Sequence, residues 1–174
     1  MRIPQRARRS RPPKATRPHM PGYGLPAGQK GLLPWAWAET RLRRSHNYWM
    51  ITVRPDATPH AMPVWGIWVD GRFFFSTGRG SRKARNLAAN RSCVVCTEQS
   101  AEAVVVEGTA AEVSDAAMIE RLAPVYQRKY TPWKLDPEMG PIFAVEPRVI
   151  FGLREKTFKD ATRWIFRRSA RRRR

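Results

Sequence analysis

"HAMPVWGIWVDGRFFFST", residues 60–77, is the stretch of sequence that decides the fold. Two runs rich in β-branched and aromatic residues, 60–69 and 72–77, flank Asp70–Gly71, a pair typical of the two-residue turn of a β-hairpin. Both alternating sets of side chains in 61–69 are apolar, with Met62, Val64 and Trp68 on one face and Pro63, Trp65 and Ile67 on the other. One set can fill a barrel, so we expect the other to be covered by a second subunit or a flat ligand.

The sequence around this hairpin indicates further short strands and few helices. Strands are expected at 47–53, 93–98, 102–113, 148–155 and 161–166. Helices are expected at 34–45, at 81–90 with Ser81 as N-cap, and at 114–130 with a kink before Pro124. About six strands, many in hairpin order, predict a mainly β protein built on an antiparallel barrel rather than a doubly wound parallel sheet.

The charge of the chain is concentrated at its two ends. The 174 residues include 33 Lys and Arg against 14 Asp and Glu, a net charge of +19. Residues 1–31 and 167–174 contain no acid and are rich in Arg, so we expect two disordered basic tails around one domain at 32–166. The tails are interpreted either as solvated extensions or as arms that bind nucleic acid or an anionic membrane surface. The folded middle shows no zinc finger, helix-turn-helix or RNA-binding motif, and no run is long enough to span a membrane.

The spacing of the two cysteines indicates the cellular compartment of the protein. Cys93 and Cys96 lie three residues apart in an expected strand, so their thiols should point to opposite faces. This spacing favours two unpaired thiols in a reducing cytoplasm over a redox pair or a zinc site. We therefore expect a cytoplasmic protein and assign no metal ligands.

The segment 76–92, "STGRGSRKARNLAANRS", is the candidate site for an anion. A strand end, a Gly-containing loop and a helix start together expose backbone N–H groups at the positive end of a helix dipole. Arg82 and Lys83 lie in the first turn of that helix, where cations are unfavourable unless an anion compensates them. A forked guanidinium beside a point charge suits a phosphate. The alternative interpretation is a solvated basic helix start.

"FFFSTGRGSRKARNLAAN", residues 73–90, resembles the flavin-phosphate segment of the pyridoxamine 5′-phosphate oxidase-like split-barrel superfamily. The resemblance extends in order over about residues 34–166 and implies a homodimeric, six-stranded antiparallel split barrel that binds a flavin-type cofactor. It implies that the phosphate is held by Thr77, Ser81, Arg82 and Lys83, with Asn86 in support. It further implies that Pro63, Val64 and Trp65 lie along the ring system, and that Arg163 and Trp164 approach from the last strand, across the dimer interface.

The departures from that superfamily point to one of its branches. Where the pyridoxal-making oxidases end in Arg-x-His, this chain has Thr162–Arg163–Trp164, and Ser76 replaces the aromatic residue before the phosphate-binding Thr. The chain is more similar to the flavin/deazaflavin oxidoreductases, which implies hydride transfer between coenzyme F420 and a small organic substrate, with FMN as the alternative cofactor. We assign no catalytic acid or base, since such cofactors carry the hydride chemistry themselves. Tyr126, Tyr130 and Trp133 are candidates for the substrate side, although helix packing explains the two tyrosines equally well.

Overall fold

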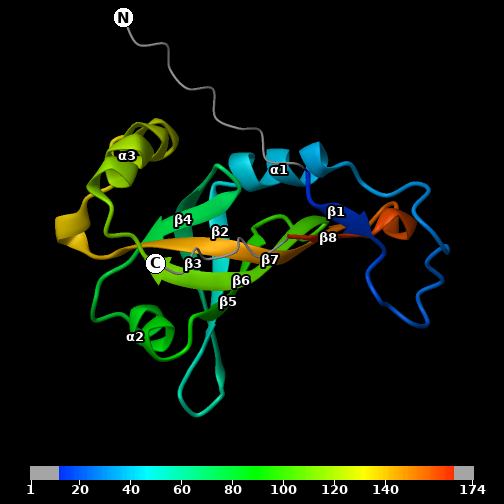
Figure 1. Ribbon diagram of the computed structural model, residues 1–174, viewed down its shortest axis with the longest axis horizontal. Helices are drawn as coiled ribbons and strands as arrows, with labels where there is room; N and C mark the ends of the chain where they lie inside the picture. Colours follow the sequence, from blue (N-terminus) through cyan, green and yellow to red (C-terminus); the bar gives the residue numbers. More distant parts are fainter. Residues whose placement is uncertain (1–11, 167–174) are drawn as a thin grey trace, which may run out of the picture.

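Six antiparallel strands close into a barrel in the computed structural model, which describes residues 12–166 (Figure 1). Around the barrel the order is β7-β4-β3-β2-β5-β6, and pairing of β6 with β7 closes the ring. The strands are β1 (Lys14–Thr16), β2 (Asn47–Val53), β3 (Pro59–Val69), β4 (Arg72–Ser76), β5 (Ser92–Thr97), β6 (Glu102–Glu112), β7 (Ile142–Arg154) and β8 (Thr162–Ile165). The prediction of a mainly β, six-stranded antiparallel barrel is confirmed.

The hairpin of β3 and β4 forms as the sequence predicts. Val69 pairs with Arg72, and between them Asp70 and Gly71 have φ values of 49° and 75°. Positive φ at both central residues is the requirement of the tight turn that matches the twist of paired strands, and Asp-Gly meets it at little steric cost.

The two faces of this hairpin are buried in different ways. Val64, Trp68 and Phe73 belong to the main core inside the barrel. On the outer face, Ile67 and Phe74 pack in a second cluster with side chains of the helix α3 (Ala116–Tyr130). Part of the outer apolar set is thus covered by the chain's own helix, rather than by the second subunit or ligand that the alternation suggested.

Three α-helices accompany the barrel, at the places that the sequence indicates. They are α1 (Trp35–Arg44), α2 (Arg82–Ala89) and α3. Short 3-10 turns at Pro137–Met139 and Phe158–Asp160 precede β7 and β8 respectively. Ser81 caps α2, because its hydroxyl accepts a hydrogen bond from the Ala84 N–H at 3.2 Å. Both α2 and α3 lie on the left in Figure 1, with β1 and β8 at the opposite end of the molecule.

Two elements differ from the sequence-based expectation. Strand β7 begins at Ile142, six residues before the predicted 148–155, and continues through Pro147 at the bulge where β6 shifts register beside Gly108. Lys14–Thr16 pairs with β8, so part of the segment 1–31 that we expected to be a disordered tail forms a strand. The remainder of the two predicted tails, 1–11 and 167–174, lies outside the described residues.

The cysteines occupy strand β5 as expected. Cys93 faces the core and Cys96 is half-buried on the opposite face; neither is in a disulfide. Burial raises the pKa of both thiols, that of Cys93 to about 12. Between residues 12 and 166, no helix combines the length and apolar character needed to cross a membrane.

Candidate functional site

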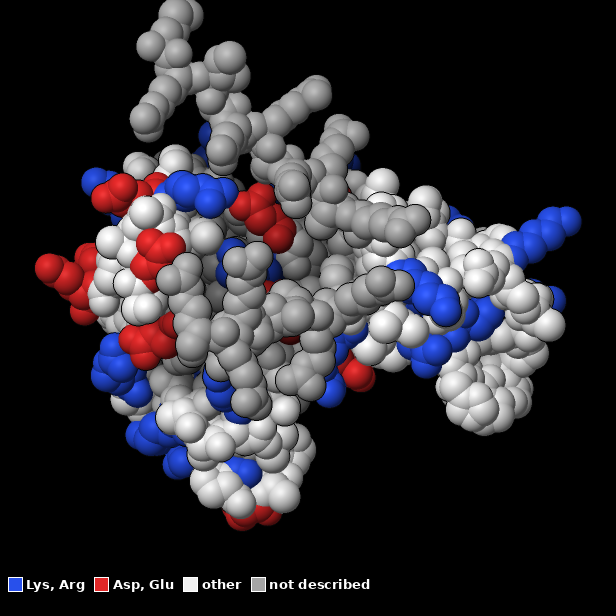
Figure 2. Space-filling model, in the orientation of Figure 1, with Lys and Arg blue, Asp and Glu red and all other residues white. Residues whose placement is uncertain are grey.

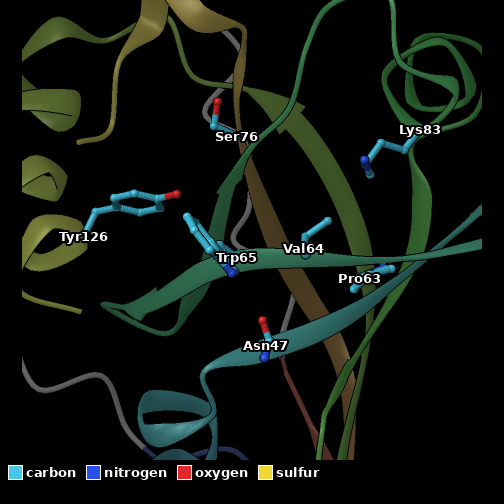
Figure 3. A pocket seen from close by; sticks show the side chains of 7 residues that line it. All are labelled: Asn47, Pro63, Val64, Trp65, Ser76, Lys83 and Tyr126. Carbon is cyan, nitrogen blue, oxygen red and sulfur yellow. The ribbon is translucent and has the colours of Figure 1, made fainter. Parts of the chain in front are cut away.

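A cavity of about 390 Å³ lies outside the barrel wall, between α2, α3 and the middle of β3 (Figure 3). Its lining comes from β2, β3, β4, α2 and α3: Asn47, Pro63, Val64, Trp65, Ser76, Lys83 and Tyr126. Figure 3 shows Lys83 at one end with its amine directed inward, and Tyr126 at the other with Trp65 between them. The cavity therefore has one cationic end and one aromatic end.

The cationic end is a cluster of three hydrogen-bonding side chains. The Lys83 Nζ donates to the Thr77 Oγ1 at 3.2 Å, and the Thr77 hydroxyl donates to the Ser81 Oγ at 3.1 Å. Strand β4 ends just before Thr77, and α2 begins just after Ser81, so the cluster sits where the sequence predicts an anion site. Burial lowers the pKa of Lys83, because its ammonium loses hydration there. An anion in the cavity would restore favourable interactions to that charge.

Further basic groups surround this corner. Burial, followed by the nearby charges of Arg54, Lys83 and Arg82, lowers the pKa of His60. Arg82 itself is exposed and does not line the cavity, and its predicted phosphate contact stays a prediction. Asn86 is fully buried and donates to the Thr52 Oγ1 at 2.9 Å, which ties α2 to β2. Asn86 thus holds the helix that carries Lys83, and its support of a bound phosphate stays a prediction.

The aromatic end is built on Trp65. Its indole stacks on the Tyr130 ring, with centroids 5.0 Å apart and planes inclined by 12°. The Tyr130 hydroxyl accepts from the Gly66 N–H at 2.8 Å and donates to the His46 carbonyl at 2.7 Å, so the platform beneath the indole is fixed. Trp133 lies 6.0 Å from Trp65 and is 61% exposed. Of the three candidates for the substrate side, Tyr126 lines the cavity, Tyr130 supports it and Trp133 flanks it.

A buried amine fastens α3 to the barrel beside this platform. The Lys129 Nζ donates to the Tyr48 hydroxyl at 2.8 Å and to the Gly66 carbonyl at 2.9 Å. Burial lowers the pKa of Lys129 to about 8, against the opposing attraction of Glu98. Because α3 carries Tyr126 and Tyr130, this contact helps to position the aromatic end of the cavity.

Lys129→Met is expected to change how stability depends on pH. The unfolded chain keeps this lysine protonated up to about pH 10.4, whereas the folded chain releases the proton near pH 8. The charge therefore costs stability below pH 8, and that cost declines as the pH rises toward 10. Between pH 7 and 9.5, wild type should gain about 1–2 kcal/mol in free energy of unfolding relative to Lys129→Met. Urea unfolding of both proteins across this range measures the difference, and parallel profiles would contradict the assignment.

Two predicted residues lie away from the cavity. Trp164 is 1% exposed and belongs to the main core, and its predicted contact with the cofactor stays a prediction. The Arg163 Nε donates to the Thr16 Oγ1 at 3.0 Å, which binds β8 to β1 at the far end of the molecule from α2 (Figure 1). In this chain Arg163 links the last two strands of the sheet, β8 and β1, and Trp164 packs from β8 into the core.

Two lining residues were not among the predicted site residues. Asn47 faces the cavity because it pairs with Trp65 across β2 and β3, and its amide Nδ2 donates to the Glu98 Oε2 at 3.1 Å. Ser76 ends β4 beside the cluster, and the sequence marked it only as a departure from the family pattern. Asn47 lies opposite Trp65 because of the register in which β2 and β3 pair. This register depends on the loop between the strands, and no sequence motif predicts it.

The closed antiparallel barrel, with a strand–loop–helix corner beside an external cavity, defines a protein of the split-barrel class. The chain belongs to the pyridoxamine 5′-phosphate oxidase family, whose model matches residues 36–152. No curated protein matches the chain.

The chain is similar in fold to solved structures of several differently named proteins. The chain is similar to general stress protein 26 from Bacillus anthracis at 19% identity and a TM-score of 0.56, covering 67% of this chain and 91% of that one. An F420 reductase matches at 21% identity and a TM-score of 0.53, over 64% of this chain and 94% of the other. A FAD-binding protein from Mesorhizobium loti matches at 14% identity and a TM-score of 0.53, over 75% and 94%. At these identities the likeness concerns the fold.

Proposed function

We propose that this protein is an oxidoreductase that binds coenzyme F420 in the cavity and transfers hydride between it and a small organic substrate. The observation that carries the proposal is the hydrogen-bonded cluster of Thr77, Ser81 and Lys83, of which Lys83 lines one end of the cavity. Pro63, Val64 and Trp65 line the wall of the same cavity. Such a cavity offers charge-assisted donors to a phosphate and a flat apolar surface to a ring system. An F420 reductase is among the solved structures with this fold, and it supports the choice of coenzyme F420 as the cofactor.

The residues present fit a deazaflavin or a flavin. Lys83, which lines the cavity, would hold the phosphate together with Thr77 and Ser81, which are linked to it by hydrogen bonds, while Pro63, Val64 and Trp65 would lie along the rings. The coenzyme supplies the hydride chemistry, and the protein contributes binding, orientation and exclusion of water. FMN is the second candidate cofactor, because the same cluster offers the same donors to its phosphate.

The aromatic end of the cavity is the proposed side for the substrate. The Tyr126 hydroxyl has no hydrogen-bond partner among residues 12–166, and Figure 3 shows it directed toward the cavity. Trp65, 37% exposed, and Trp133 add apolar surface beside it. A small organic substrate can bind there by stacking and by one hydrogen bond to Tyr126.

A second copy of the chain is the proposed partner, and the cytoplasm the proposed compartment. On the outer barrel face, Trp49 is 48% exposed and pairs in register with Pro63 on one side and Cys96 on the other. An exposed apolar surface of this kind is typical of a subunit interface. Unpaired thiols at Cys93 and Cys96 suit a reducing compartment. Nucleic-acid binding would depend on the Arg-rich ends of the chain, and it would weaken steeply with salt.

Titration of the purified protein with each cofactor tests the proposal. Coenzyme F420 should bind saturably, and FMN more weakly, when binding is followed by cofactor fluorescence and by calorimetry. Tight binding of FMN without saturable binding of coenzyme F420 would reverse the cofactor preference. If neither bound, the oxidoreductase proposal itself would be wrong.

A further inference from the structure

A second cavity, of about 470 Å³, lies on the other side of α2 from the cofactor cavity. It is bounded by α2, by the end of β6 and by the segment that leads into β7. Lys83, which lines the cofactor cavity, takes no part in it. Its volume lies within the range of sites that bind small molecules, about 300–1,000 Å³.

The floor of this second cavity is apolar. Leu87 comes from α2, Ala110 from β6 and Phe143 from β7, and all three are buried beneath it. Ala88 adds a methyl group at the wall. An apolar ligand group placed on this floor would lose its contact with water, which is favourable by about 25 cal/mol for each Å² buried.

The rim of the second cavity is basic. Arg79, Arg85 and Arg91 come from the loop before α2, from α2 itself and from the turn after it, and Glu112 is the one acid that lines the cavity within residues 12–166. Arg79 pairs with Glu112 at 2.8 Å. The Arg85 Nη1 donates to the Gly80 carbonyl at 2.7 Å, and the Arg91 Nε donates to the Ala110 carbonyl at 2.9 Å.

These hydrogen bonds orient the guanidinium groups without using all of their N–H donors. The Arg91 Nη1 and Nη2 and the Arg85 Nη2 have no partner among residues 12–166. Figure 2 shows basic side chains over the part of the surface where α2 lies, with few acids between them. With Glu112 paired to Arg79, Arg85 and Arg91 form no ion pair with any residue between 12 and 166.

We propose that this second cavity binds an amphiphilic carboxylate, with its apolar body on the floor formed by Leu87, Ala110 and Phe143 and its carboxylate on Arg85 and Arg91. The planar fork of arginine matches a carboxylate, and a charge-assisted pair of this kind is stronger than a neutral hydrogen bond. A nucleic-acid backbone would contact the rim and leave the apolar floor empty. The site is separate from the cofactor cavity, so its existence does not rest on the proposed oxidoreductase function.

Isothermal titration of the full-length protein with decanoate tests this proposal. We expect one saturable site with a dissociation constant below about 1 mM. The double variant Arg85→Ala, Arg91→Ala should weaken binding at least tenfold, which is the usual loss for a charge-assisted contact. Ala88→Trp should abolish binding, because the indole would occupy the cavity from an exposed helix position that tolerates a large side chain. Arg44→Ala, which removes an exposed arginine from α1, should leave decanoate binding unchanged and controls for net charge.

Two smaller probes test whether decanoate needs both the apolar floor and the basic rim. Acetate and octan-1-ol, which lack the apolar body and the charge respectively, should each bind at least tenfold more weakly than decanoate. Lys83→Ala should leave decanoate binding intact even if it abolishes cofactor binding. The proposal is overturned if decanoate shows no saturation, if its binding survives Ala88→Trp, or if it competes with coenzyme F420. Competition would assign the rim arginines to binding of the coenzyme.

Discussion

Lys83→Ala is expected to weaken cofactor binding at least tenfold, corresponding to about 1.5–3 kcal/mol for a lost charge-assisted contact. The Lys83 amine is the cation that lines the cavity, and it already lies 3.2 Å from the Thr77 hydroxyl. Burial lowers the pKa of Lys83, because its ammonium loses hydration there, so this charge should gain most when a phosphate binds. Fluorescence titration with coenzyme F420 and with FMN measures the change.

Control variants and a stability measurement show whether weaker binding by Lys83→Ala reflects the loss of this contact, of net charge or of folded protein. Lys156→Ala removes an exposed cation remote from the cavity and should leave the dissociation constant within twofold of wild type. Arg82→Ala should cost less than Lys83→Ala, because Arg82 is exposed and outside the cavity lining. The thermal midpoint of Lys83→Ala should stay near that of wild type, since burying the ammonium does not favour the folded state. An unchanged cofactor dissociation constant for Lys83→Ala would remove Lys83 from the site.

The strand–loop–helix corner could be predicted from sequence because its determinants are local. Ser81 precedes a short amphipathic helix, and the preceding strand ends within five residues of it, so Thr77 and Ser81 had to lie close together. The hairpin at Asp70–Gly71 was predictable for the same reason, since the turn residues themselves select the backbone conformation. Residues close together in the sequence were therefore sufficient to predict the cationic end of the cavity.

The elements that the sequence did not reveal depend on distant partners. Pro147 makes the first half of β7 look like a loop, yet it is tolerated where β6 shifts register at Gly108. Lys14–Thr16 is too short and too polar to be predicted as a strand, and it forms by adding to the edge of β8. In each case the partner strand lies far along the chain, so no local pattern contains the information.

The packing of Trp164 could not be predicted from its own strand. Its indole lies directly over Gly152 of β7, where an added Cβ would come within 2.7 Å of the ring. The absence of a side chain at Gly152 makes room for the indole in the core, where Trp164 is 1% exposed. The resemblance placed Trp164 on the last strand, but it did not single out Gly152, on which the packing of the indole depends.

Gly66→Ala is expected to lower the free energy of unfolding by about 3 kcal/mol or more, at the upper end of the range for overpacking a core. A Cβ at this position would lie 2.2 Å from the Cζ of Phe73 and 2.7 Å from the Phe74 carbonyl oxygen. The Phe73 ring cannot retreat easily, because it is fully buried and its centroid is 4.6 Å from that of Tyr48. Urea unfolding followed by tryptophan fluorescence measures the loss.

The same substitution tests whether the barrel core and the cofactor cavity share one support. The Gly66 N–H and carbonyl bind Tyr130 and Lys129, so a shift of β3 at this point would also disturb the platform under Trp65. Gly78→Ala is the matched control, since its added methyl would meet nothing within 4 Å, and its stability should stay within about 0.5 kcal/mol of wild type. Gly66→Ala should therefore lose both stability and cofactor affinity at temperatures where it is still folded. Retention of full stability would show that Phe73 does not pack against β3 at Gly66, whereas lost stability with unchanged affinity would show that the platform is held independently of the core.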